Sequence, residues 1–253
     1  MARILVTGSA QGIGRQTAAD LVGLGHEVVV HGRDDARGRA ALDAVPGAAG
    51  VVVGDLSSLA STRALAQSAG AYDVVVHNAG VGGDGKRETT VDGLSRIFQV
   101  NVLAPYVLTA LLPAPQRAIY LSSGLQASGR LDLDDPQWER RRWDGMQAYC
   151  DSKLADVLLA LWVARRSPGT VSNAVDPGWI RTAMGGRGAP GSPEEGADTQ
   201  VWLATSDEPA AVASGRYLKG RREQQPNPAA RDERLQDRLV ELCARLSGVA
   251  PAA

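Results

Sequence analysis

The N-terminal segment constrains the fold of this chain more than any other part. Residues 3–7 are a short run of apolar and β-branched residues, which is typical of a buried strand, and Gly8 ends it. The residues that follow place Ile13, Thr17 and Leu21 at helical spacing. A strand, a glycine-rich turn and a helix in this order predict the start of an α/β fold with parallel strands.

The glycines of this turn are Gly8, Gly12 and Gly14, a wider spacing than the G-x-G-x-x-G pattern. Without Cβ atoms the backbone can approach a pyrophosphate, and the start of the helix beyond supplies N–H groups and a positive dipole end. A plain tight turn is the alternative. Because the turn directly follows a first strand, it indicates a dinucleotide-binding site.

Strands and helices continue to alternate along the chain. Further strands are predicted at residues 26–31, 49–53, 72–77, 117–122, 170–175 and 215–218, and helices at 35–44, 59–68, 92–112, 146–165 and 231–246. Ser57 is expected to cap the helix at 59–68. This alternation predicts an α/β fold: a single doubly wound (Rossmann-type) parallel seven-stranded sheet with helices on both faces.

Composition and charge exclude several classes of protein. With 253 residues, 44% of them hydrophobic and 22% charged, we expect a single globular domain over residues 1–253. The net charge of -1 leaves no basic excess to neutralise the phosphates of a nucleic acid, so no nucleic-acid partner is expected.

Cys150 and Cys243 have no Cys or His neighbour at metal-ligand spacing, so they are interpreted as free thiols and no metal site is expected. The N-terminus does not resemble a signal peptide, and no apolar stretch is long enough to cross a bilayer. We therefore expect a soluble, cytoplasmic protein without a membrane partner.

Tyr149 and Lys153 stand four residues apart in the helix predicted at 146–165 and therefore share one helical face. A nearby positive charge stabilises phenolate, so Lys153 would make Tyr149 a usable acid or base near neutral pH. The alternative is a buried tyrosine beside an exposed lysine.

Six motifs in order lead to a family. The chain resembles the short-chain dehydrogenase/reductase family, and most of all its retinol dehydrogenase-like branch, in Thr7 with Gly8 to Gly14, Asn78-Ala79-Gly80, Asn101, Ser122-Ser123, Tyr149 to Lys153, and Pro177-Gly178. It departs from the family pattern at His77, where a first Asn is usual, and in having no membrane anchor.

The resemblance implies a catalytic role for four residues. Tyr149 would exchange the proton with the substrate oxygen, and Lys153 would assist it and hold the nicotinamide ribose. Ser123 would hydrogen-bond the carbonyl oxygen, because Ser122 points to the other face of the strand. Asn101 would support a proton-relay water, with local hydrogen bonding inside its helix as the alternative.

The resemblance also implies a cofactor site. Asp55 would contact the adenine, Asn78-Ala79-Gly80 would line the adenosine side, and Pro177-Gly178 with Thr182 would hold the carboxamide. Asp55 could instead belong only to its turn, and Asn78-Ala79-Gly80 could simply end the strand. The full expected set is Gly8, Ser9, Gln11, Gly12, Ile13, Gly14, Arg33, Asp55, Leu56, Asn78, Ala79, Gly80, Tyr149, Lys153, Pro177, Gly178 and Thr182.

Two segments are expected on the substrate side. The stretch of about 124–148 is longer than a strand-to-helix connection requires, and long loops in compact domains are usually functional. The glycine-rich stretch of about 181–193 is interpreted as a mobile loop opposite it. Candidate substrate residues are Trp138, Trp143, Trp179 and Met184.

The cofactor choice depends on the end of the second strand. In relatives that use NAD an acid stands there, at the position of Gly32, and Arg33 follows. A guanidinium can bind a 2′-phosphate with two charge-assisted hydrogen bonds, so NADP(H) is favoured over NAD(H). Asp34 could instead pair with Arg33 or face the ribose.

The sequence therefore predicts an NADP-dependent oxidoreductase that interconverts a carbonyl and an alcohol on a medium-sized apolar substrate, with Tyr149 as general acid/base. An NAD-dependent alcohol dehydrogenase, an isomerising relative and a catalytically silent nucleotide-binding regulator are the alternatives. The apolar residues of the helix at 146–165 cover most of its circumference, so a homodimer or homotetramer is also expected.

Overall fold

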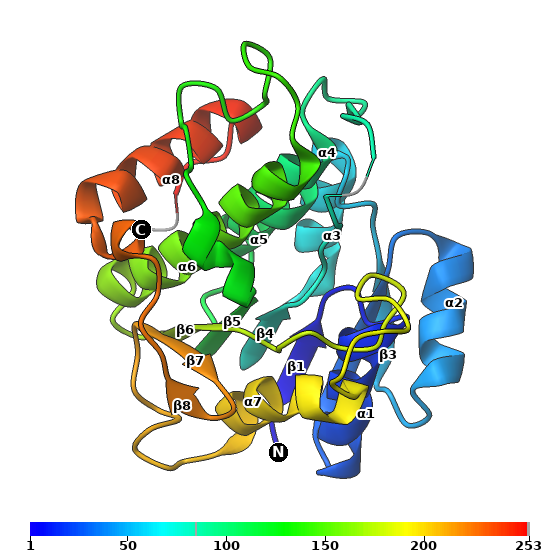
Figure 1. The fold of residues 1–253 in the computed structure, drawn as a ribbon. Coiled ribbons are helices and arrows are strands. Elements are labelled where there is room, and N and C mark those ends of the chain that lie inside the picture. Colours follow the sequence, from blue (N-terminus) through cyan, green and yellow to red (C-terminus); the bar gives the residue numbers. More distant parts are fainter. Residues whose placement is uncertain (84, 252–253) are drawn as a thin grey trace.

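The computed structural model of the protein describes residues 1–83 and 85–251, and its strands form an eight-stranded sheet (Figure 1). The strand order is β3-β2-β1-β4-β5-β6-β7-β8, and the chain moves outward from β1 first in one direction and then in the other. The first seven strands are parallel, and β8 is antiparallel to β7. The doubly wound α/β fold is thus confirmed, with one strand more than predicted, the two-residue β8.

The strands are β1 (Arg3–Val6), β2 (Glu27–Gly32), β3 (Gly50–Val53), β4 (Val74–His77), β5 (Arg117–Leu121), β6 (Val171–Val175), β7 (Arg216–Lys219) and β8 (Arg222–Glu223). The α-helices are α1 (Gly12–Gly23), α2 (Asp35–Ala44), α3 (Leu59–Ala69), α4 (Arg96–Phe98), α5 (Ala104–Leu111), α6 (Gly145–Arg166), α7 (Pro193–Thr205) and α8 (Glu233–Ser247). A π-helical segment (Gln99–Leu103) joins α4 to α5, and short 3-10 helices follow β5 (Gly124–Ser128) and precede α8 (Pro228–Arg231).

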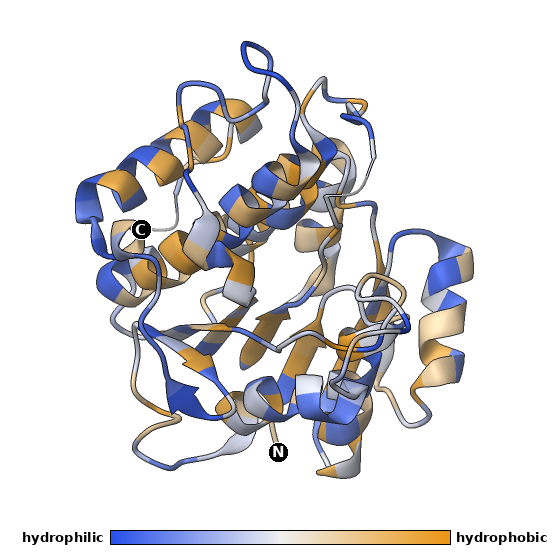
Figure 2. Cartoon of the chain, viewed as in Figure 1, coloured by the Kyte–Doolittle hydropathy of each residue, from blue (hydrophilic) through white to orange (hydrophobic). Residues whose placement is uncertain are grey.

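Helices cover both faces of the sheet because its strands are apolar on both sides. Ile4 and Val6 of β1 pack with α1 and α7, whereas Leu5 between them packs with α3 and α5. Figure 1 shows α1 and α7 on one side of the sheet and α5, α6 and α8 on the other. Figure 2 shows the hydrophobic central strands between these two layers.

The helix predicted at 92–112 begins later and is not regular. It starts at Arg96, and residues 99–103 are π-helical before α5 begins. Pro105 has no N–H, and its ring crowds the carbonyl group four residues earlier, at Asn101. The wider π-helical turn lies directly before this proline, and such turns are frequent at functional sites.

Ser58, and not Ser57, caps α3. The Ser58 hydroxyl accepts a hydrogen bond from the Ser61 backbone N–H at 3.3 Å, whereas the Ser57 hydroxyl donates to Asp55 at 2.7 Å. The helix begins one residue too late for Ser57 to reach its N–H groups, so the predicted cap was wrong.

Helix α7 was not predicted, although its start carries a sequence signal. Ser192 accepts a hydrogen bond from the Glu195 N–H, and the Glu195 carboxylate accepts one from the Ser192 N–H. This reciprocal pair is a capping box, whose Ser-x-x-Glu spacing can be found in the sequence.

Helix α6 is buried within the chain on more than one side. Leu154, Val157 and Leu158 are almost inaccessible and share a cluster with Leu239 and Leu242 of α8. Hydrophobic and hydrophilic residues alternate along α8 (Figure 2), so its apolar side covers the part of α6 that the sheet leaves free. The apolar surface that suggested self-association is therefore covered in the monomer, and the homo-oligomer stays a prediction for light scattering.

Leu239 tests how much the packing of α8 on α6 contributes to stability. Its side chain is 0% exposed, and Leu239→Ala should lower the free energy of unfolding by about 2–5 kcal/mol, because it removes buried methyl groups and leaves a cavity. Urea unfolding measures the difference. Glu241→Ala changes an exposed residue of the same helix and should have an effect within about 0.5 kcal/mol. Equal effects of the two variants would mean that α8 contributes little.

His77 at the end of β4 predicts a pH dependence of stability. The ring is buried, its plane stacks on Tyr120 at 4.6 Å between centroids, and burial lowers the pKa of His77 from 6.5 to about 3. Between these values the unfolded chain binds the proton and the folded chain does not, so stability falls as the pH falls below about 6.5.

The variant His77→Phe keeps a stacked ring and removes this proton site. In that pH window wild type should lose about 1.4 kcal/mol more per pH unit than His77→Phe, and the difference should be constant above about pH 7. Urea unfolding at a series of pH values gives both profiles. Parallel profiles below about pH 6 would rule out a neutral His77 in the folded protein.

Candidate active site

A cleft of ≈ 560 Å³ opens at the carboxyl ends of the strands, where β1 and β4 lie side by side. In doubly wound folds this is the point at which the strand order reverses and ligands bind. Most of the expected cofactor residues line the cleft: Gly8, Gln11, Gly12, Ile13, Gly14, Arg33, Asp55, Leu56, Asn78, Ala79, Gly80, Tyr149, Lys153, Pro177 and Thr182.

The glycine-rich turn packs directly against the end of β4. Gly8 has φ +65°, and a Cβ atom there would lie 2.8 Å from the Cα atom of Ala79. A Cβ atom on Gly14 would lie 2.2 Å from the Asn78 amide nitrogen and 2.6 Å from the Gly8 carbonyl oxygen. A side chain at Gly8 would push the turn away from Ala79, and one at Gly14 would push α1 away from Asn78. Glycine at both positions therefore lets the turn and the start of α1 pack against the end of β4.

His31 and Ser9 support this turn from behind. The Gly8 N–H donates to His31 Nδ1 at 2.9 Å, and His31 Nε2 lies 2.9 Å from the Gly54 carbonyl oxygen, so Nε2 carries the proton. The His31 backbone N–H donates to Ser9 Oγ at 2.7 Å. Burial lowers the pKa of His31, which favours this neutral form. Ser9 is thus buried behind the turn, and His31 lines the cleft, which the sequence did not indicate.

Two arginines lie at the end of the cleft beside β2. Arg33 Nε is 3.4 Å from the Asp34 carboxylate, and both side chains are exposed. Asp34 also caps α2, because its Oδ1 accepts a hydrogen bond from the Arg37 N–H at 2.8 Å. That hydrogen bond, with the charges of Arg33 and Arg37, lowers the pKa of Asp34. Arg37 lines the cleft as well, although the sequence analysis did not single it out.

Gly32, between this end of the cleft and α2, has no room for a side chain. A Cβ atom there would lie 2.3 Å from the Gly38 nitrogen, which belongs to the second turn of α2. An acidic residue at this position would therefore require a shift of α2 away from β2. Asp55, on the neighbouring strand end, accepts hydrogen bonds from the Ser57 N–H and hydroxyl at 2.9 and 2.7 Å.

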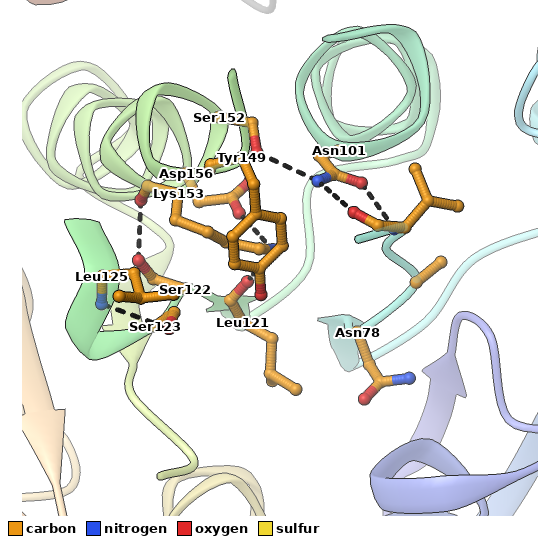
Figure 3. A network of polar contacts seen from close by, with 12 residues as sticks. Asn78, Asn101, Leu121, Ser122, Ser123, Leu125, Tyr149, Ser152, Lys153 and Asp156 are labelled. Atoms are coloured by element: carbon orange, nitrogen blue, oxygen red, sulfur yellow. Dashed lines mark hydrogen bonds and ion pairs between the residues drawn. The ribbon is translucent and has the colours of Figure 1, made fainter. Parts of the chain in front are cut away.

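Tyr149 and Lys153 line the same cleft from α6, and Lys153 Nζ lies 5.7 Å from the centroid of the Tyr149 ring. Ser152 lies between them in sequence, and its hydroxyl donates to the Tyr149 carbonyl at 2.8 Å and accepts from the Asn101 amide at 3.0 Å. Figure 3 shows this network with Tyr149 in its centre.

Asn101 lies in the π-helical segment and does not bond only within its own helix. Its Oδ1 accepts a hydrogen bond from the Val81 N–H at 2.8 Å, and its Nδ2 donates to the Val81 carbonyl at 3.1 Å. Asn101 therefore joins the loop after β4 to α6 through Ser152. It does not line the cleft itself.

The ammonium group of Lys153 is buried and has two partners. It donates to the Leu121 carbonyl at 2.8 Å and to the Asp156 carboxylate at 2.7 Å. Burial alone would lower the pKa of Lys153, but the charges of Asp156 and Tyr149 raise it more, and the net change is upward. Asp156 was not foreseen as part of the site.

The two serines after β5 are engaged differently. Ser122 is buried and donates to the Lys153 carbonyl at 2.6 Å, so its hydroxyl proton is used inside the protein. Ser123 Oγ accepts a hydrogen bond from the Leu125 N–H at 3.2 Å, which leaves its hydroxyl proton free to be donated. Ser122 lines the cleft, whereas Ser123 does not, so the catalytic role of Ser123 stays a prediction. Figure 3 shows both serines on one side of Tyr149, opposite Asn101.

The substrate candidates are spread over two segments. Trp138 is 8% exposed and packs with Ile97, Ala148 and the partly buried Trp143, so neither tryptophan lines the cleft. The insertion at 124–148 thus packs part of its aromatic surface inside, and its role as a pocket wall stays a prediction.

The loop after β6 supplies the remaining candidates. Met184 lines the cleft and is 50% exposed. Trp179 is 64% exposed and its Nε1 donates to the Gly185 carbonyl, whereas Gly178 and Trp179 do not line the cleft. The stretch at 181–193 is irregular and pairs at its ends through Ile180 and Gly191, and its mobility stays a prediction.

Within residues 1–83 and 85–251, no group of three or more His, Cys, Asp or Glu side chains is arranged to hold a metal ion. In the same part of the chain, no helix combines the length and the apolar character that crossing a membrane requires.

Known proteins resemble this chain over almost its full length. The family model described as short chain dehydrogenase matches residues 2–124. The chain is 39% identical to "Short-chain dehydrogenase chyC" of Penicillium rubens over 98% of each chain. It is 35% identical to human retinol dehydrogenase 13, with 97% of this chain and 84% of that protein covered.

A solved structure agrees with these relatives. The crystal structure of an uncharacterised protein from Mycobacterium paratuberculosis superposes with a TM-score of 0.88 at 28% identity, and covers 100% of this chain and 96% of that one. The fold, the cleft and the relatives lead to one conclusion: the chain belongs to the short-chain dehydrogenase/reductase family, in its retinol dehydrogenase-like branch, and is an oxidoreductase acting on CH–OH and C=O groups.

Proposed function

We propose that the protein is an NADP-dependent reductase or dehydrogenase that interconverts a carbonyl and an alcohol on a medium-sized apolar substrate. The observation that carries this proposal is one cleft with Tyr149 and Lys153 at one end and the glycine-rich turn and Arg33 at the other. A dinucleotide needs close approach to the backbone at its pyrophosphate, and reduction of a carbonyl needs a proton donor beside the nicotinamide; this cleft offers both.

The glycine-rich turn fits the cofactor because Gly8, Gly12 and Gly14 line the cleft and, without side chains, let the backbone approach a pyrophosphate. The residues proposed to hold it are the turn with Ile13 and Gln11, Asp55 and Leu56 at the adenine, Asn78 to Gly80 at the adenosine, and Pro177, Gly178 and Thr182 at the carboxamide. The bound nicotinamide supplies or accepts the hydride, and the protein supplies orientation and the proton.

Tyr149 is proposed to donate the proton to the carbonyl oxygen in reduction and to accept it in oxidation. Ser123 is proposed to donate a hydrogen bond to the same oxygen. Its hydroxyl proton is free, whereas the hydroxyl of Ser122 donates to the backbone carbonyl of Lys153. Lys153 supplies the positive charge beside Tyr149, and Asn101 holds the loop after β4 against α6.

The preference for NADP(H) rests on charge and space beside β2. Arg33 and Arg37 both line the cleft, and guanidinium groups bind phosphates with paired hydrogen bonds. The position where NAD-dependent relatives carry an acid is Gly32, and the close approach of α2 excludes a side chain there. The carboxylate of Asp34 is engaged by the Arg37 N–H and by Arg33.

An NAD-dependent alcohol dehydrogenase is the second candidate, because Asp34 remains near enough to Arg33 to compete for the ribose. A silent nucleotide-binding regulator is not favoured, since Tyr149, Lys153 and Ser123 are all present. The substrate is proposed to be apolar because Met184 lines the cleft and because one relative is named retinol dehydrogenase. A cytoplasmic location is part of the same proposal.

Tyr149→Phe tests the proposed chemistry. Following NADPH absorbance with a panel of aldehydes, ketones and quinones should first show turnover by wild type. The variant should then lose at least about a hundredfold in kcat, as expected for the loss of a general acid, while its affinity for NADPH stays nearly unchanged. Tyr72→Phe, which removes a hydroxyl remote from the cleft, is the control. A Tyr149→Phe variant with near-normal turnover would exclude Tyr149 as the proton donor.

Arg33→Ala tests the cofactor preference. Wild type should have a higher kcat/KM with NADPH than with NADH, and the variant should lose about tenfold or more with NADPH only, because a hydrogen bond to a charged group is removed. Arg39→Ala removes an exposed arginine of α2 that does not line the cleft and should leave the ratio unchanged. A wild-type preference for NADH, or a ratio unaffected by Arg33→Ala, would remove Arg33 from phosphate recognition.

A further inference from the structure

Lys153 and Asp156 form a buried ion pair directly behind the cleft. Their side chains are 6% and 4% exposed, and Nζ and Oδ2 are 2.7 Å apart. Both residues belong to α6, three positions apart, so the helix itself brings them together. A buried charge is strongly unfavourable when it is unpaired, so each of the two groups depends on the other.

The pair also limits where the ammonium group can point. An ammonium group has three N–H donors, and here Asp156 and the Leu121 carbonyl accept two of them. The third is therefore left for the cleft, which Lys153 lines together with Tyr149. A Cβ atom on Gly80 would lie 3.6 Å from Nζ, so the opposite wall of the cleft is close to the ammonium group.

We propose that Asp156 is a positioning residue for Lys153: it keeps the lysine protonated and accepts one of its N–H groups, the Leu121 carbonyl accepts a second, and the third is presented to the cofactor and Tyr149. The inference rests on the proposed function, in which Lys153 acts as a cation at the nicotinamide end. Asp156 itself does not line the cleft and is not assigned contact with substrate or cofactor.

The charges around the pair support this assignment. Burial lowers the pKa of Lys153, whereas Asp156 and Tyr149 raise it, so the lysine depends on Asp156 to remain an ammonium group. Burial raises the pKa of Asp156 to about 6, although Lys153 opposes the shift, so Asp156 is ionised above that pH.

Tyr149 faces the Lys153 ammonium, with 5.7 Å between Nζ and the centroid of its ring, and belongs to the proposed proton transfer. The remaining titratable groups near the pair do not change charge in the neutral range. On β5, burial raises the pKa of Tyr120, whose hydroxyl lies 2.7 Å from Thr109 Oγ1 of α5. Thr109 Oγ1 is 3.4 Å from His77 Nε2, and burial lowers the pKa of His77 to about 3. On α6, burial raises the pKa of Cys150. A pH effect between about 7 and 9 that depends on Asp156 therefore reports on the charge of Lys153 and on its coupling to Tyr149.

Asp156→Asn keeps the shape and one acceptor but removes the charge. Without the carboxylate a buried lysine loses its proton at a lower pH, so the variant should lose activity as the pH rises from about 7 to about 9. The ratio of kcat at the higher pH to kcat at the lower pH should fall about tenfold or more below the wild-type ratio, since one pKa unit changes the protonated fraction tenfold. A ratio within each protein cancels any general loss of folded enzyme. Asp156→Glu retains a carboxylate and should recover most of the wild-type ratio.

The matched control is Asp151→Asn. Asp151 is a buried carboxylate on the same helix, but it accepts hydrogen bonds from the Arg130 N–H and from Gln147, and not from Lys153. The same isosteric change at Asp151 should leave the ratio of kcat at the higher pH to kcat at the lower pH at its wild-type value. If Asp156→Asn and Asp151→Asn share the wild-type ratio, the proposal is overturned.

NADPH binding, followed by the fluorescence of the bound cofactor, gives a readout that needs no turnover. Relative to wild type at each pH, the dissociation constant of Asp156→Asn should rise between about pH 7 and about pH 9, because the ammonium that faces the cofactor is lost. If wild type reduces no carbonyl in the panel and this rise is seen, the proposed function fails and the role of Asp156 stands. If wild type reduces carbonyls and neither kcat nor binding acquires the pH dependence, the role of Asp156 fails alone.

A double variant covers the case in which Asp156→Asn does not fold. Lys153→Met/Asp156→Leu removes both charges and fills the space with apolar groups, which is often neutral or stabilising for a buried pair. It should fold and melt at a higher temperature than Asp156→Leu alone. If the double variant is no more stable than the single one, Asp156 is needed for a reason other than the charge of Lys153, and the proposal is overturned.

Discussion

Hydrogen bonds between the ends of β1 and β4 hold together the point on which the rest of the site depends. Thr7 Oγ1 accepts from the N–H groups of Asn78 and Ala79, each at 3.0 Å, and the Asn78 amide donates to the Thr7 carbonyl at 2.7 Å. The strand order reverses between β1 and β4. The connections that leave these two strands therefore run in opposite directions along the sheet and leave a crevice between them. Without these bonds the glycine-rich turn would have no fixed wall opposite it.

Buried hydrogen bonds also fix the end of the cleft that contains Tyr149 and Lys153. Ser122, Ser152 and Asn101 fix the elements that carry Tyr149 and Lys153. Their bonds join the end of β5, the start of α6 and the π-helical segment. A buried polar group without a partner is costly, so each of these bonds favours one arrangement of the helices over its neighbours.

Helix α8 of the same chain packs on α6. The apolar residues of α6 that face away from the sheet are covered by Leu239 and Leu242, and the Tyr106 hydroxyl donates to the Val249 carbonyl after α8 at 2.8 Å. The helix that carries Tyr149 and Lys153 is therefore held from two sides within one chain. Contacts within one chain thus support the helix that carries the candidate active site.

The sequence by itself determined the fold class, the glycine-rich turn, and the positions of Tyr149 and Lys153, because these depend on local periodicity and on residue types with special backbone or acid–base properties. The tertiary structure decided what lies beside them. That His31 supports Gly8 and that Trp138 packs inside depends on contacts between segments far apart. Asp156 stands at helical spacing from Lys153, but only the packing around α6 shows that the pair is buried. Local patterns carry no information on such contacts, since the same side chain is stable in the core or at a pocket according to what packs against it.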